Sequence, residues 1–166
     1  VFATPQGGPA DRPVANASGL DLATCDGSAS AAFRGCSEAT ALPALRVDHV
    51  VLRTADAEAS IRLFARQLGI RLALDRAVPE WGGRMLFFRA GKLTLEVIEP
   101  DSPPEQADHF WGIAYQCPDL EEEAVRLRRG GVDLSPIRPG RKPGTRVATV
   151  KSHCLGIPTL LIEPTT

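Results

Sequence analysis

The chain has 166 residues with 19 basic and 20 acidic side chains, so its formal net charge at pH 7 is −1. That length suits one compact domain or two fused halves, and the balanced, scattered charge favours neither nucleic acid nor a membrane surface as a partner. No apolar run is long enough to span a bilayer. The four cysteines form no CxxC or zinc-type spacing, so we interpret them as reduced thiols of a cytoplasmic protein, with a Cys25–Cys36 disulfide as the alternative.

The first 44 residues differ in composition from the remainder of the chain. They are rich in Gly, Pro, Ala and Ser, a composition that buries little apolar surface and favours loop or disorder. Only LDLATC at 20–25 resembles a strand. We therefore predict a flexible or arm-like segment over residues 1–44 and a folded domain over residues 45–166. Such an arm can also cover a sheet edge or exchange between subunits of a homodimer.

The first predicted module covers residues 45–101 and has the order strand, helix and three strands. Its opening strand, RVDHVVLR, is a Val-rich apolar run. Asp56 is placed to cap the helix that follows, and Gly69 ends it. The apolar stripe of that helix has helical spacing and consists of Ile61, Phe64, Ala65 and Leu68. The three closing strands are expected at 70–76, 84–90 and 93–99.

The second predicted module covers residues 108–166 and repeats this order. Its opening strand is WGIAYQC at 111–117, and Asp119 is the expected helix cap. The helix has Glu in its first turn and Arg in its last turn, which matches the helix dipole, and Gly130 with Gly131 stops it. The remaining strands are expected at 132–137, 145–151 and 158–163.

The two modules are copies of one pattern. Asp56 and Asp119 are 63 residues apart, and the closing runs LTLEVIEP at 93–100 and IPTLLIEP at 157–164 are 64 apart. Two copies of a small sheet can pair to enclose a cup, and any site in that cup is shared by both. The sequence therefore predicts an α+β fold in which two βαβββ modules pair to enclose a cup.

One candidate site joins the first and last strands of the first module. Side chains alternate across a strand, so His49 and Arg53 share one face of the opening strand and Asp48 is expected on the other. If the closing strand is a neighbour, His49 and Glu96 can hold two positions on one divalent ion such as Zn, Ni, Mn or Fe. The alternative is an ordinary strand histidine and a solvated glutamate.

The chain resembles the vicinal-oxygen-chelate superfamily, which includes glyoxalase I, methylmalonyl-CoA epimerase, extradiol dioxygenases and the bleomycin- and fosfomycin-resistance proteins. The resemblance covers about residues 45–165. It rests on the paired βαβββ modules, on DHVVLRTADAEASIRLFARQLG at 48–69 and on LEVIEP at 95–100. It implies that the two modules pair into an incomplete, cup-like barrel that holds a divalent metal and the substrate. The metal ligands would come from the first and last strands of each module.

The resemblance places metal ligands at His49 and Glu96 in the first module, but the second module departs from the pattern. There His49 corresponds to Gly112, and Glu96 corresponds to Thr159 or Leu160, none of which is a normal ligand.

A third ligand therefore has to come from elsewhere. His109 is a candidate, although it lies three residues before the expected position and needs a bulge to reach the site. A dimer partner, the N-terminal arm or the substrate are the other sources. Glu163 is the counterpart of Glu99 and should point to the opposite face from Glu96.

Four further side chains are predicted to bind substrate. Arg53 and Gln116 occupy equivalent places in the two copies, and an Arg there can bind a carboxylate or phosphate through two hydrogen bonds. Trp111 and Tyr115 can supply flat apolar walls to a small-molecule site. The alternative for each aromatic is that it fills the core between sheet and helix.

These observations favour a glyoxalase- or epimerase-like enzyme, a lyase or isomerase with a degenerate metal site, acting on a small oxygen-rich or anionic metabolite. A metal would polarise a carbonyl while Glu96 or another base moves a proton. The alternative is a metal-free small-molecule-binding protein of the drug-sequestering, resistance type. An iron dioxygenase is less favoured, because its second histidine is missing at Gly112.

Overall fold

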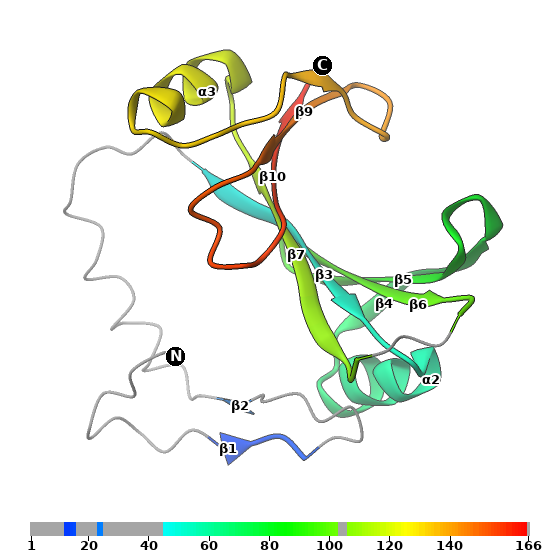
Figure 1. The fold of residues 1–166 in the computed structure, drawn as a ribbon. Coiled ribbons are helices and arrows are strands. Elements are labelled where there is room, and N and C mark those ends of the chain that lie inside the picture. Colours follow the sequence, from blue (N-terminus) through cyan, green and yellow to red (C-terminus); the bar gives the residue numbers. More distant parts are fainter. Residues whose placement is uncertain (1–11, 16–22, 25–44, 103–105, 166) are drawn as a thin grey trace.

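The computed structural model of the chain describes residues 12–15, 23–24, 45–102 and 106–165 (Figure 1). Over these residues, eight strands form one mixed sheet that curves but does not close into a barrel, and two helices lie on its outer side. This confirms the predicted α+β fold of two βαβββ modules around an open cup. No helix in the described ranges is long and apolar enough to cross a membrane.

The first module has the predicted order of elements. Asp56 caps its helix by accepting a hydrogen bond from the Ala59 amide at 2.9 Å. The helix begins as one α-helical turn and continues as a π-helix. In chain order the elements are β3 (Arg46–Arg53), α2 (Ala57–Ser60), the π-helix η1 (Ile61–Gln67), β4 (Arg71–Val78), the 3-10 turn η2 (Pro79–Trp81), β5 (Gly83–Ala90) and β6 (Leu93–Pro100).

The second module repeats the order with a shorter third element. Asp119 caps the helix by accepting from the Glu122 amide at 2.9 Å, and Gly131 follows the helix at a φ of 81° that suits glycine. The strand predicted at 132–137 is wrong, since only Leu134 makes an isolated bridge there and Pro136 has no amide hydrogen to donate. The elements are β7 (His109–Gln116), α3 (Leu120–Arg129), β8 (Arg138–Pro139), β9 (Thr145–Val150) and β10 (Thr159–Pro164).

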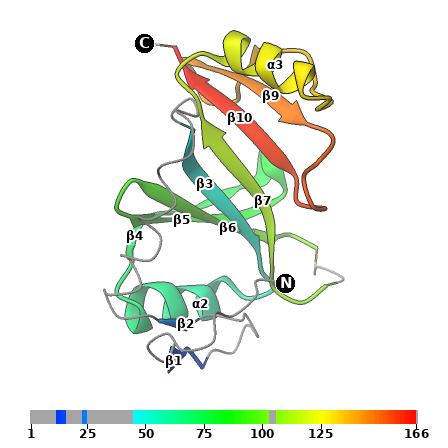
Figure 2. The ribbon, with the colours of Figure 1, turned by 90° about the vertical axis from the view of Figure 1, so that its left-hand side faces the viewer.

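The strand order in the sheet is β4-β5-β6-β3-β7-β10-β9-β8 (Figure 2). The opening strands of the two modules, β3 and β7, pair antiparallel at its centre, and each is flanked by the parallel closing strand of its own module. His49 lies opposite Ala114, and Val51 lies opposite Gly112. A shift of 63 residues exchanges these two pairs, so the halves are related by an approximate two-fold axis that passes between them.

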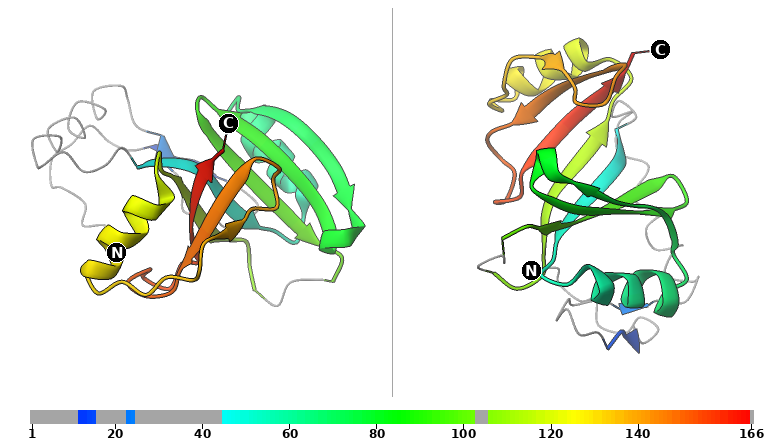
Figure 3. Two further views of the ribbon diagram at one scale, coloured as in Figure 1. Left: turned by 90° about the horizontal axis from the view of Figure 1, so that it is seen from above. Right: turned by 90° about the vertical axis from the view of Figure 1, so that its right-hand side faces the viewer.

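Each module buries its own apolar core between the sheet and its helix (Figure 3). The first core includes alternate residues of β5 and β6 packed on the helix: Leu52, Ala57, Leu63, Phe64, Leu86, Phe88, Leu95 and Val97. The second core consists of Cys117, Leu120, Ala124, Leu134, Ala148 and Leu161. The other residues of these strands therefore face the concave side of the sheet.

The central β3–β7 pair contains two β-bulges. The pairing shifts between Val47 and His49, which leaves Asp48 unpaired, and again next to Val51, which leaves Trp111 unpaired. Asp48 and Trp111 are 63 residues apart, so both copies contain the same irregularity. A bulge changes the face to which the residues beyond it point.

The N-terminal segment has two short strands, β1 (Arg12–Pro13) and β2 (Ala23–Thr24), which pair with each other and not with the main sheet. Val14 packs against the first core, and the Gln67 side chain donates to the Ala15 carbonyl at 3.1 Å. β2 falls within the strand predicted at 20–25. Most of residues 1–44, including Cys25 and Cys36, lies outside the described residues.

We expect the Asp119 cap to contribute measurably to stability. Asp119→Ala removes the acceptor for the Glu122 amide, and loss of such a cap costs about 1 kcal/mol. For a chain of this size that lowers Tm by about 2–4 °C, measured by calorimetry or circular dichroism. Asp119→Asn keeps a capping oxygen and serves as the control. Equal melting of the Ala and Asn variants would contradict the assignment.

Candidate functional site

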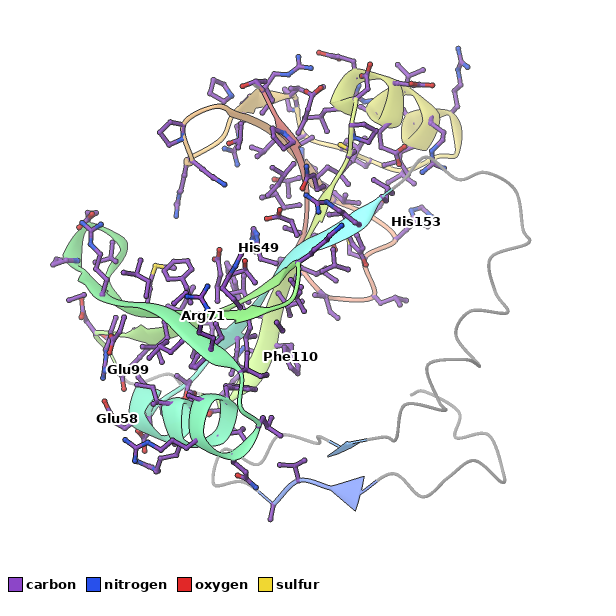
Figure 4. All side chains as sticks on the ribbon, turned by 180° about the vertical axis from the view of Figure 1, so that it is seen from behind. His49, Glu58, Arg71, Glu99, Phe110 and His153 are labelled. Atoms are coloured by element: carbon purple, nitrogen blue, oxygen red, sulfur yellow. The ribbon has the colours of Figure 1, made fainter. Side chains whose placement is uncertain are left out.

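The structure brings the predicted pair His49 and Glu96 together on the concave side of the sheet. β3 and β6 are parallel neighbours, with His49 opposite Thr94 and Val51 opposite Glu96. The Nδ1 atom of His49 lies 3.9 Å from Oε1 of Glu96. Leu95 and the other β6 residues of its face pack in the first core, so Glu96 points away from the helix. Figure 4 shows His49 on the side of the sheet that the two modules enclose.

Asp48 joins this pair, although strict alternation places it on the opposite face. Its Oδ2 atom lies 3.0 Å from Nδ1 of His49. The cause is the β-bulge at Asp48, which interrupts the alternation along β3. The sequence contains no sign of this bulge, because it depends on how β3 pairs with β7, more than sixty residues later in the chain.

Glu96 is the site residue whose protonation is most altered by the fold. Only 22% of its side chain is exposed. Burial raises the pKa of Glu96, the neighbouring His49 partly opposes this effect, and the Asp48 carboxylate adds to it. A carboxyl group with a raised pKa exchanges its proton closer to neutral pH, which is the property required of a general acid or base.

The equivalent positions in the second module carry no donor side chain. Gly112 is the two-fold counterpart of His49. Leu160 pairs with Ala114 as Glu96 pairs with Val51, so Leu160 and not Thr159 is the counterpart of Glu96. A Cβ atom at Gly112 would lie 3.3 Å from the Pro158 carbonyl oxygen, so a larger residue there requires a small shift.

The structure does not bring His109 to His49 and Glu96. His109 pairs with Arg53 at the far end of β3, while the residue opposite His49 is Ala114. Five residues of β7 separate these two positions, about 16 Å of extended strand. The Nδ1 atom of His109 lies 2.8 Å from the Ala107 carbonyl oxygen.

Glu163 points to the helix side of the sheet, as its repeat position predicts. It accepts a hydrogen bond from Arg146 at 2.8 Å, and the same Arg146 contacts Glu121 of α3. Its counterpart Glu99 accepts from the Ala57 amide of α2 at 2.9 Å (Figure 4). Neither carboxylate is available to the concave site.

The four predicted substrate-binding residues do not converge on one point. The guanidinium carbon of Arg53 lies 5.9 Å from the centroid of the Trp111 ring. Gln116 is at the opposite end of the β3–β7 pair, where it accepts a hydrogen bond from Arg46. Tyr115 packs against the second core on the helix side, which is the alternative to a cup wall.

The donor set does not complete a divalent-metal site. Catalytic sites normally use three protein ligands and one open position. Across the described ranges, no group of three or more His, Cys, Asp or Glu side chains is arranged to hold an ion. Gly112 and Leu160, the counterparts of His49 and Glu96, contribute no ligand. The metal site implied by the resemblance therefore does not fit these residues.

Comparison with known families gives one match. The sequence profile described as Glyoxalase/Bleomycin resistance protein/Dioxygenase superfamily matches residues 48–149. No curated protein matches the chain.

Solved structures with the same fold include a hypothetical protein from Bacillus halodurans, with a TM-score of 0.60 at 19% identity, covering 74% of this chain and 96% of that one. A methylmalonyl-CoA epimerase from Mycobacterium tuberculosis has a TM-score of 0.56 at 21% identity, covering 72% and 88%. The Streptomyces coelicolor enzyme in complex with 2-nitronate-propionyl-CoA has a TM-score of 0.57 at 20% identity, covering 73% and 98%. At these identities the similarity shows the fold alone.

Replacing Glu96 with Gln should stabilise the protein at neutral pH, because a buried carboxylate is costly and Gln keeps its shape. The raised pKa of Glu96 means that its contribution to stability is full below the unfolded value, about 4.3, and is lost as pH rises through the folded value. We expect Tm of Glu96→Gln to exceed wild type by about 2–4 °C at pH 7 and to match it near pH 4.

Glu99→Gln is the matched control, since Glu99 lies on the same strand but faces α2. It should give no gain in Tm at pH 7. A Tm of Glu96→Gln at or below wild type at pH 7 would show that the Glu96 carboxylate is not destabilised by burial.

Proposed function

The chain belongs to the glyoxalase/bleomycin resistance protein/dioxygenase superfamily, and on this premise we propose that it is a glyoxalase- or epimerase-like enzyme. It is a lyase or isomerase with a degenerate metal site, acting on a small oxygen-rich or anionic metabolite. The observation that supports this is the buried Glu96 carboxyl group beside His49 on the concave face.

Glu96 is the proposed acid and base. A carbon next to a carbonyl group loses its proton to a carboxylate that lies within hydrogen-bond reach of it, and return of the proton to the other face or to a neighbouring carbon completes the isomerisation. Burial raises the pKa of Glu96, which makes its carboxylate a stronger base than a solvated one. It also keeps competing water away from the carboxyl group.

His49 is the proposed partner for a substrate oxygen. The Asp48 carboxylate accepts the proton on Nδ1 at 3.0 Å, which fixes the ring orientation and leaves Nε2 as the acceptor in the neutral imidazole. In the part of the chain that the structure describes, Nε2 has no hydrogen-bond partner. It is therefore available to accept the proton of a substrate hydroxyl while Glu96 acts on the adjacent carbon.

No step of this mechanism passes through a metal ion, because the donors among the described residues do not complete a site. A Zn, Ni, Mn or Fe ion held by His49 and Glu96 needs a further donor. A substrate oxygen or a residue of a partner subunit in a homodimer would supply it.

The solved epimerase structures support the isomerase assignment over the lyase. One of these enzymes is in complex with methylmalonyl-CoA and another with 2-nitronate-propionyl-CoA. We extend to this chain only the type of reaction, proton transfer at carbon. A cytoplasmic location remains part of the proposal.

The second candidate function is metal-free binding of a small molecule, as in the drug-sequestering proteins of the superfamily that this chain resembles. It is favoured by the second module, where Gly112 and Leu160 stand in place of His49 and Glu96 and supply no acid, base or metal ligand. In that case His49 and Glu96 contact the ligand without changing it.

The two functions differ in proton exchange. In D₂O, wild-type protein incubated with small 2-oxo, 2-hydroxy and thioester acids should incorporate deuterium next to the carbonyl of its substrate, observed by NMR. Glu96→Gln should lower the rate by about 10²–10⁴-fold, the usual contribution of a general base. Glu163→Gln, whose carboxylate faces α3, should retain the wild-type rate. Binding of a compound without exchange in any protein would support the sequestering function instead.

Metal content tests the degenerate site. We expect that protein purified without chelator or affinity metal holds less than one equivalent of Zn, Ni, Mn or Fe. The double variant Gly112→His/Leu160→Glu restores donors at the two empty positions and should bind one equivalent, about 10-fold tighter or more, measured by elemental analysis and zinc titration. Adding His49→Ala should abolish this gain. One equivalent in wild type, lost in His49→Ala/Glu96→Gln, would contradict the assignment.

A further inference from the structure

Within the described residues, four arginines on the helix side of the sheet form ion pairs, and none on its concave side does. Arg62, Arg84, Arg126 and Arg146 lie on the helix side or on the helices, and each forms an ion pair with a carboxylate. The arginines on the concave faces of β3, β4 and β5 form no ion pair with any carboxylate of the described residues: Arg46, Arg53, Arg71, Arg76 and Arg89. Among the described residues, no carboxylate therefore pairs with these five positive charges.

Two of these arginines are direct cross-strand neighbours. Arg71 of β4 lies opposite Arg89 of β5, and both side chains are exposed. Like charges directly opposite each other destabilise a sheet. No carboxylate of the described residues pairs with either arginine, which is the arrangement of a site that receives its negative charge from a ligand.

The arginine pair is aligned with the candidate catalytic residues. Arg89 lies opposite Thr94 and donates a hydrogen bond to its hydroxyl oxygen, and Thr94 lies opposite His49. Arg71, Arg89, Thr94 and His49 thus form one row across four neighbouring strands. Figure 4 labels Arg71 and His49. Arg89 and His49 are two strand spacings apart, about 10 Å between backbones.

We propose that Arg71 and Arg89 bind a dianionic group, a phosphate or phosphonate, of the metabolite on which Glu96 acts. This rests on the proposed function and names its substrate class. Two guanidinium groups match the charge of a dianion and offer paired N–H donors to its oxygens. Because the anion site and Glu96 are separated by about two strand spacings, the substrate is a compact phosphorylated or phosphono metabolite with only a few carbon atoms between the two groups.

Binding of simple anions tests the site without knowledge of the substrate. The probes are inorganic phosphate, glycerol phosphate, methylphosphonate and acetate at matched ionic strength, titrated into ¹⁵N-labelled protein and followed by NMR. The variant is Arg71→Gln/Arg89→Gln. Its control, Arg66→Gln/Arg129→Gln, removes the same charge from exposed helix positions. Melting curves should show the Arg71→Gln/Arg89→Gln variant at least as stable as wild type, since it loses a like-charge pair.

The expected result is that the dianions bind wild type at least 10-fold tighter than acetate and shift the amides of β4, β5 and β6. Arg71→Gln/Arg89→Gln should lose at least 10-fold in dianion affinity, and the control should keep wild-type affinity. Tighter binding of glycerol phosphate or methylphosphonate than of inorganic phosphate identifies an organic ligand, whereas the reverse order identifies free phosphate and overturns the substrate assignment. Equal affinity in all three proteins, or no preference for dianions, overturns the site.

The two proposals fail separately. Glu96→Gln should leave dianion affinity within about twofold of wild type, since Glu96 does not contact either arginine. Dianion binding that depends on Arg71 and Arg89, without proton exchange on any phosphorylated probe, would refute the enzyme and retain the anion site. Proton exchange on substrates that lack a dianionic group, unaffected by Arg71→Gln/Arg89→Gln, would refute the anion site and retain the enzyme.

Discussion

The antiparallel pairing of β3 with β7 is the constraint on which the rest of the structure depends. These strands open the two modules, and their hydrogen bonds join two four-stranded units into one curved sheet. A bulge at Asp48 and its counterpart at Trp111 change the face of the sheet to which the residues beyond them point. As a result Leu45, the first residue of the first module, packs against the core of the second module. The same bulge brings Asp48 to His49.

The two copies have kept their fold and lost their chemical equivalence. Both helices begin at an aspartate cap, and both closing strands direct a glutamate, Glu99 or Glu163, to the helix side. These residues stabilise a module whatever it binds. On the concave face, where no packing requirement fixes the residue, His49 is matched by Gly112 and Glu96 by Leu160. The histidine and the glutamate of the cup therefore belong to the first module alone.

Charged side chains are also arranged differently on the helix side and on the concave side of the sheet. On the helix side, arginines and carboxylates pair, as at Arg84 with Asp75 and Glu58. On the concave side, a partly buried carboxyl group and uncompensated arginines remain. Neither contributes to stability: burial of Glu96 disfavours its charged form, and Arg71 repels Arg89. Groups that a fold keeps at a cost to its stability are characteristic of binding and catalytic sites.

Local chemistry in the sequence determined the modules and half of the site. Capping by Asp56 and Asp119, helical spacing and the repeat itself predicted the βαβββ order, and alternation along two strands placed His49 and Glu96 on one face, because each of these depends only on nearby residues. Tertiary structure decided what depends on pairing between distant strands. The β3–β7 register packed Tyr115 against the second core, kept His109 far from His49 and added Asp48 to the site. A bulge changes the face of the sheet to which every residue beyond it points. The position of a bulge depends on pairing with the partner strand, and local sequence does not encode that pairing.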